Sequence, residues 1–214
     1  KALDVNSNGV KNLVNFCEKN NVKLIHFSTD YVYNSLNKKP INEDELIDPQ
    51  NYYGYTKREG EKHIENSNGE SIVIRTSWLY SKYGNNFVNS IIDKSKKGEN
   101  LKVINDQFGC PTYARDLALA VIQILESNKR IDKKAKIFNY SNTESTNWFD
   151  FAKKILKLYG SNSKVEPVDS KYFKDEVKRP KFSITSKQKI IDTFNLEINN
   201  WDSSLTNYII NDLK

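Results

Sequence analysis

A tyrosine and a lysine four positions apart are the first candidates for chemistry in this sequence. Tyr53 and Lys57 would lie on one face of a helix that contains both. A neighbouring ammonium group stabilises a phenolate and lowers the pKa of the tyrosine, which then becomes a usable proton donor near neutral pH. Ser28 and Thr29 offer hydroxyl groups that could hold a carbonyl oxygen beside it. Taken alone, the spacing of this pair favours the plainer interpretation, two side chains on a helix surface.

These residues depend on the elements that carry them. The sequence predicts a buried strand over 23–29, a long polar loop with two prolines over 34–51, and a helix over 53–65. Further strands are expected over 71–77, 102–104 and 136–140, and further helices over 5–20, 86–97, 112–125, 147–159 and 202–213. Alternating strands and helices indicate an α/β fold with a mainly parallel sheet. Ligands of such sheets bind beyond the carboxyl ends of the strands.

Composition excludes several classes of protein. The 214 residues are 37% hydrophobic and 28% charged, which excludes a disordered chain. No apolar run approaches the roughly 20 residues that span a bilayer, so no membrane association is expected. Two cysteines, Cys17 and Cys110, are too few for a disulfide framework and indicate a reducing compartment, the cytoplasm.

The chain carries a net charge of +6, and its lysines are spread over its whole length. A nucleic-acid-binding protein would be expected to gather them in one patch. The distribution instead indicates a solvated surface without a nucleic-acid partner, and it is compatible with a phosphate-bearing substrate.

The order of these features resembles the catalytic layout of the short-chain dehydrogenases, in particular their extended branch, which modifies sugar nucleotides. A strand ends in Ser-Thr, a loop follows, and Tyr-x-x-x-Lys opens a helix. Five segments are similar to motifs of the dTDP-4-dehydrorhamnose reductases, in the expected order and spacing: STDYVY at 28–33, RTSWLY at 75–80, GNNFV at 84–88, NDQFGCPT at 105–112 and RPKFS at 179–183.

Two neighbouring families fit less well. Sugar-nucleotide dehydratases usually carry Asp-Glu after the threonine, with the glutamate serving in water elimination, whereas Tyr31 takes that place here. Epimerases of the UDP-galactose type have a serine-rich segment there without the aspartate.

The resemblance implies a Rossmann-like doubly wound parallel sheet with a smaller C-terminal lobe that binds substrate. Residues 1–80 and 112–145 would form the remainder of the NAD(P)-binding domain, and residues 81–111 and 146–214 would form most of the substrate lobe.

The implied reaction is the reduction by NADPH or NADH of the C4 keto group of dTDP-4-dehydro-L-rhamnose. The product, dTDP-L-rhamnose, is a precursor of cell-surface polysaccharide. By resemblance, Tyr53 would donate a proton to the C4 oxygen, Thr29 would bind that oxygen, and Lys57 would hold the nicotinamide ribose. Ser28, Tyr53 and Thr76 would complete the cofactor contacts.

The substrate contacts follow from the same resemblance. Tyr31 and Trp78 would line the sugar pocket, Asn86 and Arg179 would hold the diphosphate, and Gln107 would lie on the nucleotide side. The plain alternatives are a core tryptophan for Trp78, a loop cap for Asn86 and a solvated surface charge for Arg179. Asn6 resembles an asparagine that lies beneath the active site in the family, or it caps a helix.

One part of the family pattern is missing from this sequence. None of the eight glycines forms the Gly-x-x-Gly-x-x-Gly turn whose helix receives the cofactor pyrophosphate. We therefore expect the chain to be a piece of a longer protein, or to have its sheet covered by a partner. The choice between NADPH and NADH would depend on that missing part.

Other functions remain open at this stage. One relative of these reductases is a non-catalytic regulatory subunit of methionine adenosyltransferase, and an inactive truncated fragment is a third possibility.

The histidines and cysteines indicate no further site. His26, expected in the core, and His63, on a polar helix face, form no metal cluster with other ligands. Neither Cys17 nor Cys110 is given a catalytic role. A homodimer is compatible with the resemblance, as is a divalent ion, although no residue requires the ion.

Overall fold

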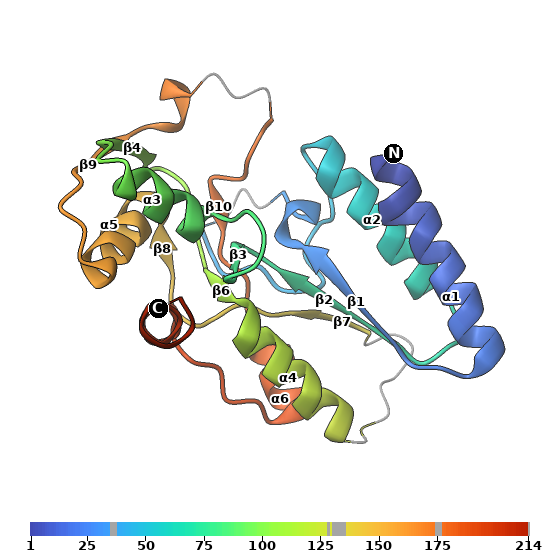
Figure 1. Cartoon of the computed structure of the whole chain (residues 1–214). Helices are drawn as coiled ribbons and strands as arrows, with labels where there is room; N and C mark the ends of the chain where they lie inside the picture. Colours follow the sequence, from blue (N-terminus) through green and yellow to red (C-terminus); the bar gives the residue numbers. More distant parts are fainter. Residues whose placement is uncertain (35–37, 128, 130–135, 174–176, 214) are drawn as a thin grey trace.

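A three-stranded parallel sheet forms the centre of the larger lobe (Figure 1). The computed structural model describes residues 1–34, 38–127, 129, 136–173 and 177–213. The sheet has the order β1 (Leu24–Thr29), β2 (Ser71–Thr76) and β7 (Ile137–Asn139). Its register places Thr29 beside Thr76, so β1 and β2 end at the same edge of the sheet.

Helices cover both faces of this sheet. A π-helical turn, η1 (Asp4–Asn8), leads into α1 (Gly9–Asn20), which lies with α2 (Tyr52–Glu65) on one face. The helices α4 (Ala114–Glu126) and α6 (Gln188–Phe194) lie on the other. Because successive side chains of a strand point to opposite faces, Val73 packs with Val10, Val14 and Ile64, whereas Ile72 and Ile74 pack in the cluster of α4 and α6.

The smaller lobe has its own apolar core. It contains α3 (Phe87–Lys96), α5 (Trp148–Tyr159), α7 (Trp201–Asn207) with the π-helical turn η5 (Tyr208–Asp212), and the parallel pair β4 (Leu101–Ile104) and β9 (Val165–Val168).

Short strands and turns connect the two lobes. The strand β3 (Leu79–Tyr80) pairs with β6 (Thr112–Tyr113), and β5 (Phe108–Gly109) lies between β8 (Thr146–Asn147) and β10 (Phe182–Ser183). Two 3-10 turns, η2 (Asp30–Val32) and η4 (Ser170–Tyr172), complete the described elements.

Asparagines begin four of the helices. The side chains of Asn51, Asn86, Asn147 and Asn200 each accept a hydrogen bond from the backbone N–H three residues later, at 2.8–3.0 Å. This bond satisfies one of the free N–H groups at a helix start. These four asparagines therefore determine where their helices begin.

The α/β fold with a parallel sheet is confirmed, and each predicted long helix and strand is present within a few residues. The helix predicted over 112–125 begins at Ala114, because Thr112 and Tyr113 pair with β3 instead. The sequence did not indicate α6, β9 or the two-residue strands. Residues 35–37 of the predicted loop and 128 and 130–135 of the predicted domain ranges lie outside the described residues.

The predicted assignment of residues 146–214 mostly to the substrate lobe takes in α6, whose Ile190 and Phe194 pack with Phe138 of the sheet. Among the described helices, none is both long and apolar enough to cross a membrane.

Candidate active site

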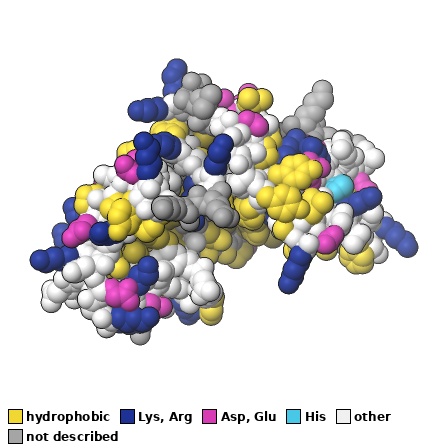
Figure 2. Space-filling view, turned by 90° about the horizontal axis from the view of Figure 1, so that it is seen from above, with side chains coloured by type: hydrophobic (Ala, Val, Ile, Leu, Met, Phe, Trp, Pro, Cys, Tyr) yellow, Lys and Arg dark blue, Asp and Glu magenta, His cyan; other side chains and the backbone are white. Residues whose placement is uncertain are grey.

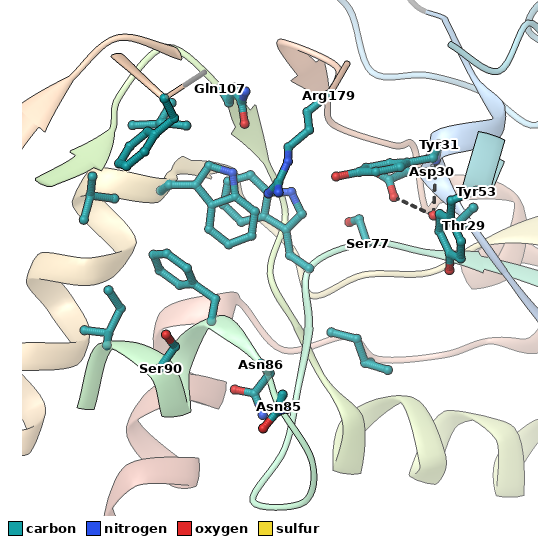
Figure 3. A pocket seen from close by; sticks show the side chains of 18 of the residues that line it. Thr29, Asp30, Tyr31, Tyr53, Ser77, Asn85, Asn86, Ser90, Gln107 and Arg179 are labelled. Carbon is teal, nitrogen blue, oxygen red and sulfur yellow. Dashed lines mark hydrogen bonds between the residues drawn. The ribbon is translucent and has the colours of Figure 1, made fainter. Parts of the chain in front are cut away.

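The residues selected from the sequence line one cavity of about 1120 Å³ where the sheet edge faces the smaller lobe. All ten contribute to its wall: Ser28, Thr29, Tyr31, Tyr53, Lys57, Thr76, Trp78, Asn86, Gln107 and Arg179. Figure 3 shows Thr29, Tyr31 and Tyr53 together on one side of the cavity and Asn85, Asn86 and Ser90 on another, with Gln107 and Arg179 above. Residues that are up to 151 positions apart (28 to 179) thus meet in one place.

The start of α2 places Tyr53 beside the end of β1. Asn51 caps the helix at the N–H of Gly54, and the ring of Tyr53 packs edge-on against Tyr31, with centroids 6.0 Å apart. Gly54 makes this approach possible, because a Cβ atom there would lie 2.2 Å from the carbonyl oxygen of Tyr31.

The pKa of Tyr53 is raised, not lowered as the sequence suggested. Burial is the main cause, the nearby Asp30 carboxyl adds to it, and the Thr29 hydroxyl opposes it. The Lys57 ammonium is directed elsewhere, since its Nζ donates to the carbonyl oxygen of Phe27 at 2.7 Å and lies 3.4 Å from Nε2 of His26. At neutral pH Tyr53 therefore keeps its proton.

Lys57 retains donor capacity for a ligand. Its ammonium has three N–H groups, and two are used by neutral acceptors, Phe27 and His26. Burial lowers the pKa of Lys57, and the Glu61 carboxylate opposes that change. Lys57 lines the cavity with Ser28 and Thr76, so this end of the wall offers an ammonium and two hydroxyls. Such a set suits the hydroxyl groups of a ribose.

Two tryptophans build the wall toward the smaller lobe. Trp78, in the left-handed region at φ 47°, stacks on Trp148 with ring centroids 3.4 Å apart and an interplanar angle of 9°. Gly109 allows this position, because a Cβ atom there would lie 2.6 Å from the Trp78 ring. Trp78 is thus held both as a member of the aromatic core and as part of the cavity wall.

The remaining predicted contacts differ in their surroundings. Asn86 accepts from the backbone N–H of Asn89 and so caps α3, and it also donates to the carbonyl oxygen of Ser81 at 2.7 Å. It therefore caps a helix, where a loop cap was the plain alternative, and it also lines the cavity. Gln107 is buried, whereas Arg179 is exposed and reaches the cavity from the segment before β10.

Asn6 lies outside the cavity wall. It is inside η1, where it caps no helix, and its Nδ2 donates to the Thr56 hydroxyl of α2 at 3.0 Å. It therefore joins the first helical segment to the helix that carries Tyr53.

Neither histidine has a metal-binding environment in the described part of the chain, where no cluster of three metal-ligating side chains occurs. His26 is half-buried beside Lys57, and burial together with the Lys57 charge lowers its pKa to about 4. His63 contacts the hydroxyl of Ser7 at 3.2 Å. Cys110 is buried and Cys17 is partly buried, and both are free thiols.

Sequence reasoning missed several parts of the wall. The sequence identified Asp30 only as part of the motif at 28–33 and gave no role to Trp148, Phe87 or the segment 99–104. The structure shows that all of them line the cavity. An acid next to the Ser-Thr pair was the one available signal. The others come from elements whose spatial position depends on the packing of the smaller lobe.

Positive charge is dispersed over the surface. Figure 2 shows lysine and arginine side chains scattered across the whole visible face, without one continuous basic patch. Lys94, Lys102 and Arg179 are among the residues that line the cavity.

Comparison with known proteins agrees with this geometry. Residues 1–213 match the family described as RmlD substrate binding domain. The dTDP-4-dehydrorhamnose reductase of Sinorhizobium fredii is 33% identical over 211 residues, which are 95% of this chain and 71% of that protein. The spore coat polysaccharide biosynthesis protein SpsK of Bacillus subtilis is 33% identical over 185 residues, which are 86% of this chain and 63% of that relative.

Crystal structures are similar as well. The dTDP-4-dehydrorhamnose reductase of Bacillus anthracis, in complex with NADP, superposes with a TM-score of 0.88 at 33% identity and covers 97% of this chain and 72% of that one. The dTDP-4-dehydrorhamnose reductase of Clostridium acetobutylicum superposes with a TM-score of 0.88 at 35% identity. This match covers 95% of this chain and 71% of that one. The match over residues 1–213 and these similarities show that the chain belongs to the RmlD substrate-binding-domain family of the dTDP-4-dehydrorhamnose reductases.

Proposed function

We propose that this chain supplies the substrate pocket and the proton donor for reduction of the C4 keto group of dTDP-4-dehydro-L-rhamnose to dTDP-L-rhamnose by NADPH or NADH. The observation that carries the proposal is the single cavity lined by all ten selected residues. The names of the relatives support the substrate class, and the NADP complex of the Bacillus anthracis protein supports the cofactor class.

Tyr53 is the proton donor in this proposal. Burial and the Asp30 carboxyl raise its pKa, so it reaches the substrate as a neutral phenol. When the carbonyl oxygen gains negative charge, the phenol proton moves to it. The Thr29 hydroxyl opposes this rise in pKa, and Thr29 lines the same cavity.

Lys57, with Ser28 and Thr76, would hold the nicotinamide ribose. The hydroxyls of Ser28 and Thr76 and the remaining N–H of Lys57 fit hydroxyl groups of a sugar, and these residues line the same cavity as Tyr53. A bound nicotinamide cofactor supplies the hydride. The protein residues supply position and the proton.

The outer cavity would hold the sugar nucleotide. Tyr31 and Trp78 would contact the sugar ring, and Arg179 with Asn86 would contact the diphosphate, for which a guanidinium is well suited. Gln107 would face the nucleoside. Four cationic side chains line this cavity, Lys57, Lys94, Lys102 and Arg179, against the carboxyls of Asp30 and Glu99.

The test compares two tyrosines at the start of α2. In the intact purified protein, Tyr53→Phe should reduce turnover of dTDP-4-dehydro-L-rhamnose by about 10²-fold or more, the range for loss of a general acid. NADPH oxidation measures this rate. Tyr52→Phe is the control, because Tyr52 is exposed, stacks on Tyr55 and does not line the cavity. Substrate binding without turnover in the unsubstituted protein would contradict the proposal and favour a binding protein.

A further inference from the structure

One asparagine joins two segments that carry residues of the cavity wall. Asn51 precedes α2, and its Oδ1 accepts a hydrogen bond from the backbone N–H of Gly54 at 2.8 Å. Its Nδ2 donates to the carbonyl oxygen of Lys178 at 3.0 Å. One side-chain amide therefore holds both the start of the helix that carries Tyr53 and the backbone directly before Arg179.

A second hydrogen bond holds the other side of Arg179. The carbonyl oxygen of Lys181 accepts from the backbone N–H of Phe108 at 2.9 Å, where β10 begins to pair with β5. Only Arg179 and Pro180 lie between the two bonded carbonyl groups. A proline ring fixes its own φ at about −65°, and the residue before a proline is restricted to extended conformations. The backbone of Arg179 is thus confined between the start of α2 and β5.

The Arg179 side chain enters the cavity from this short segment. Arg179 lines the wall together with Tyr53 and Gln107. In the view of Figure 3 it points into the cavity between Gln107 and Tyr31. An arginine side chain is long and has many rotamers, so the position of its backbone determines which part of the cavity the guanidinium can reach. The bond from Asn51 therefore bears on where Arg179 can hold a ligand.

The donated bond distinguishes Asn51 from two other asparagines that cap helices. Asn86 donates to the carbonyl oxygen of Ser81, five positions away. Asn147 donates to the carboxylate of Asp150, three positions away. The corresponding bond of Asn51 spans 127 positions and reaches a different part of the fold. Capping uses only the accepting oxygen, so the donated bond is a separate contribution of this side chain.

We propose that Asn51 is a positioning residue that fixes Arg179 relative to Tyr53, so that a bound diphosphate is held at a set distance from the proton donor. The inference rests on the proposed function, because it takes Arg179 as the diphosphate contact and Tyr53 as the proton donor. Loss of the donated bond should weaken binding through Arg179, and retention of the cap should leave Tyr53 in place.

Two substitutions separate the two bonds of Asn51. Asn51→Thr keeps a side-chain oxygen for the cap, since threonine also caps helices and the extended backbone of Asn51 (φ −141°, ψ 162°) suits a β-branched residue. It removes the amide that donates to Lys178. Asn51→Ala removes both bonds. In the intact protein, Asn51→Thr should raise KM with little change in kcat. Asn51→Ala should also lower kcat, because the start of α2 is no longer held.

Binding of dTDP tests whether Asn51 acts through Arg179. Calorimetry should give Asn51→Thr an affinity about fivefold lower, within the range of one hydrogen bond. In an Arg179→Gln background the same substitution should have almost no further effect, because residues that act through one another are not additive. Asn200→Thr is the control and should leave the affinity unchanged, since Asn200 caps α7 by the same kind of bond and does not line the cavity.

A measurement without ligand is independent of the substrate. The order parameter of the Arg179 backbone N–H, from ¹⁵N relaxation, should fall in Asn51→Thr and not in Asn200→Thr. An unchanged order parameter in Asn51→Thr overturns the proposal. So does an unchanged dTDP affinity, an equal loss of affinity in the Arg179→Gln background, or a kcat that falls as far in Asn51→Thr as in Asn51→Ala. If the unsubstituted protein binds no dTDP, the proposed function is contradicted, and the order parameter decides whether Asn51 fixes Arg179.

Discussion

At the scale of single residues, one buried ion pair holds α2 to the sheet. Arg75 donates from Nε to Glu61 Oε1 at 2.9 Å and from Nη2 to Oε2 at 2.7 Å. Arg75 also donates to the Tyr33 hydroxyl at 2.7 Å. These contacts of Arg75 therefore connect β2, α2 and the segment that follows β1. The first two carry Thr76 and Tyr53, and the third follows directly on Thr29.

Arg75→Met should destabilise the protein strongly. The side chains of Arg75 and Glu61 are 1% and 0% exposed, and removing one partner of a buried pair leaves an uncompensated charge, at a cost of about 3–5 kcal/mol. Urea unfolding measures this loss. The control is Lys62→Met, which breaks the exposed pair of Lys62 and Glu59 on the same helix and should change stability by less than about 1 kcal/mol. Equal effects of the two substitutions would contradict the argument.

His26 should make the fold sensitive to acid. Burial and the Lys57 charge lower its pKa from 6.5 to about 4. The unfolded chain therefore binds a proton at a higher pH than the folded chain does. The part of the folding stability that depends on neutral His26 is fully present above pH 6.5. It is lost as the pH falls toward 4, by up to about 3 kcal/mol. His26→Phe should remove this part of the slope in urea unfolding across that range. Parallel curves for the two proteins would refute the prediction.

At the scale of elements, glycines set the distance between α2 and its neighbours. A Cβ atom on Gly60 would lie 2.2 Å from the carbonyl oxygen of Asn6, so the two helical segments pack through this position. Gly60→Ala should separate them and destabilise the protein by about 1–3 kcal/mol, a usual cost of overpacking.

A second glycine provides the matched control. Gly9, at φ −60°, begins α1, and a Cβ atom there would meet its nearest neighbour at 3.4 Å. Gly9→Ala should be neutral or stabilise the protein by up to about 1 kcal/mol through helix propensity. Thermal unfolding of both variants compares the effects. A Gly60→Ala variant as stable as Gly9→Ala would show that the helices can move apart freely.

Elements with a strong local pattern could be predicted from the sequence. The helix α1 and the strand β2 carry clear apolar patterns. The strand β5 is two residues long and is fixed by partners at 146–147 and 182–183, far along the chain. Local sequence contains no information on such pairing.

The candidate site shows the same difference between what local sequence determines and what packing determines. The motif selected Tyr53 and Lys57 correctly as cavity residues, but the direction of the Tyr53 pKa depends on burial and on Asp30.

At the scale of the whole molecule, the cavity lies between the apolar clusters of the two lobes. Clusters on both faces of the sheet form the core of the larger lobe, and another cluster lies among α3, α5 and α7. Neither core alone closes the cavity, because Thr29 comes from the larger lobe and Trp148 from the smaller one. A ligand long enough to touch both, such as a nucleoside diphosphate sugar, would therefore bind the lobes together.

Binding of dTDP should depend on this charge distribution. Its affinity, measured by calorimetry, should fall as salt rises from about 0.05 M to about 0.5 M, because salt screens attraction between exposed charges. Thymidine, which lacks the diphosphate, should show little dependence. Arg179→Gln should weaken dTDP binding by about tenfold or more, the value of a charged hydrogen bond. Arg115→Gln is the control, since Arg115 pairs with Asp212 outside the cavity. Equal losses in both variants would mean that net charge, and not the cavity, attracts the diphosphate.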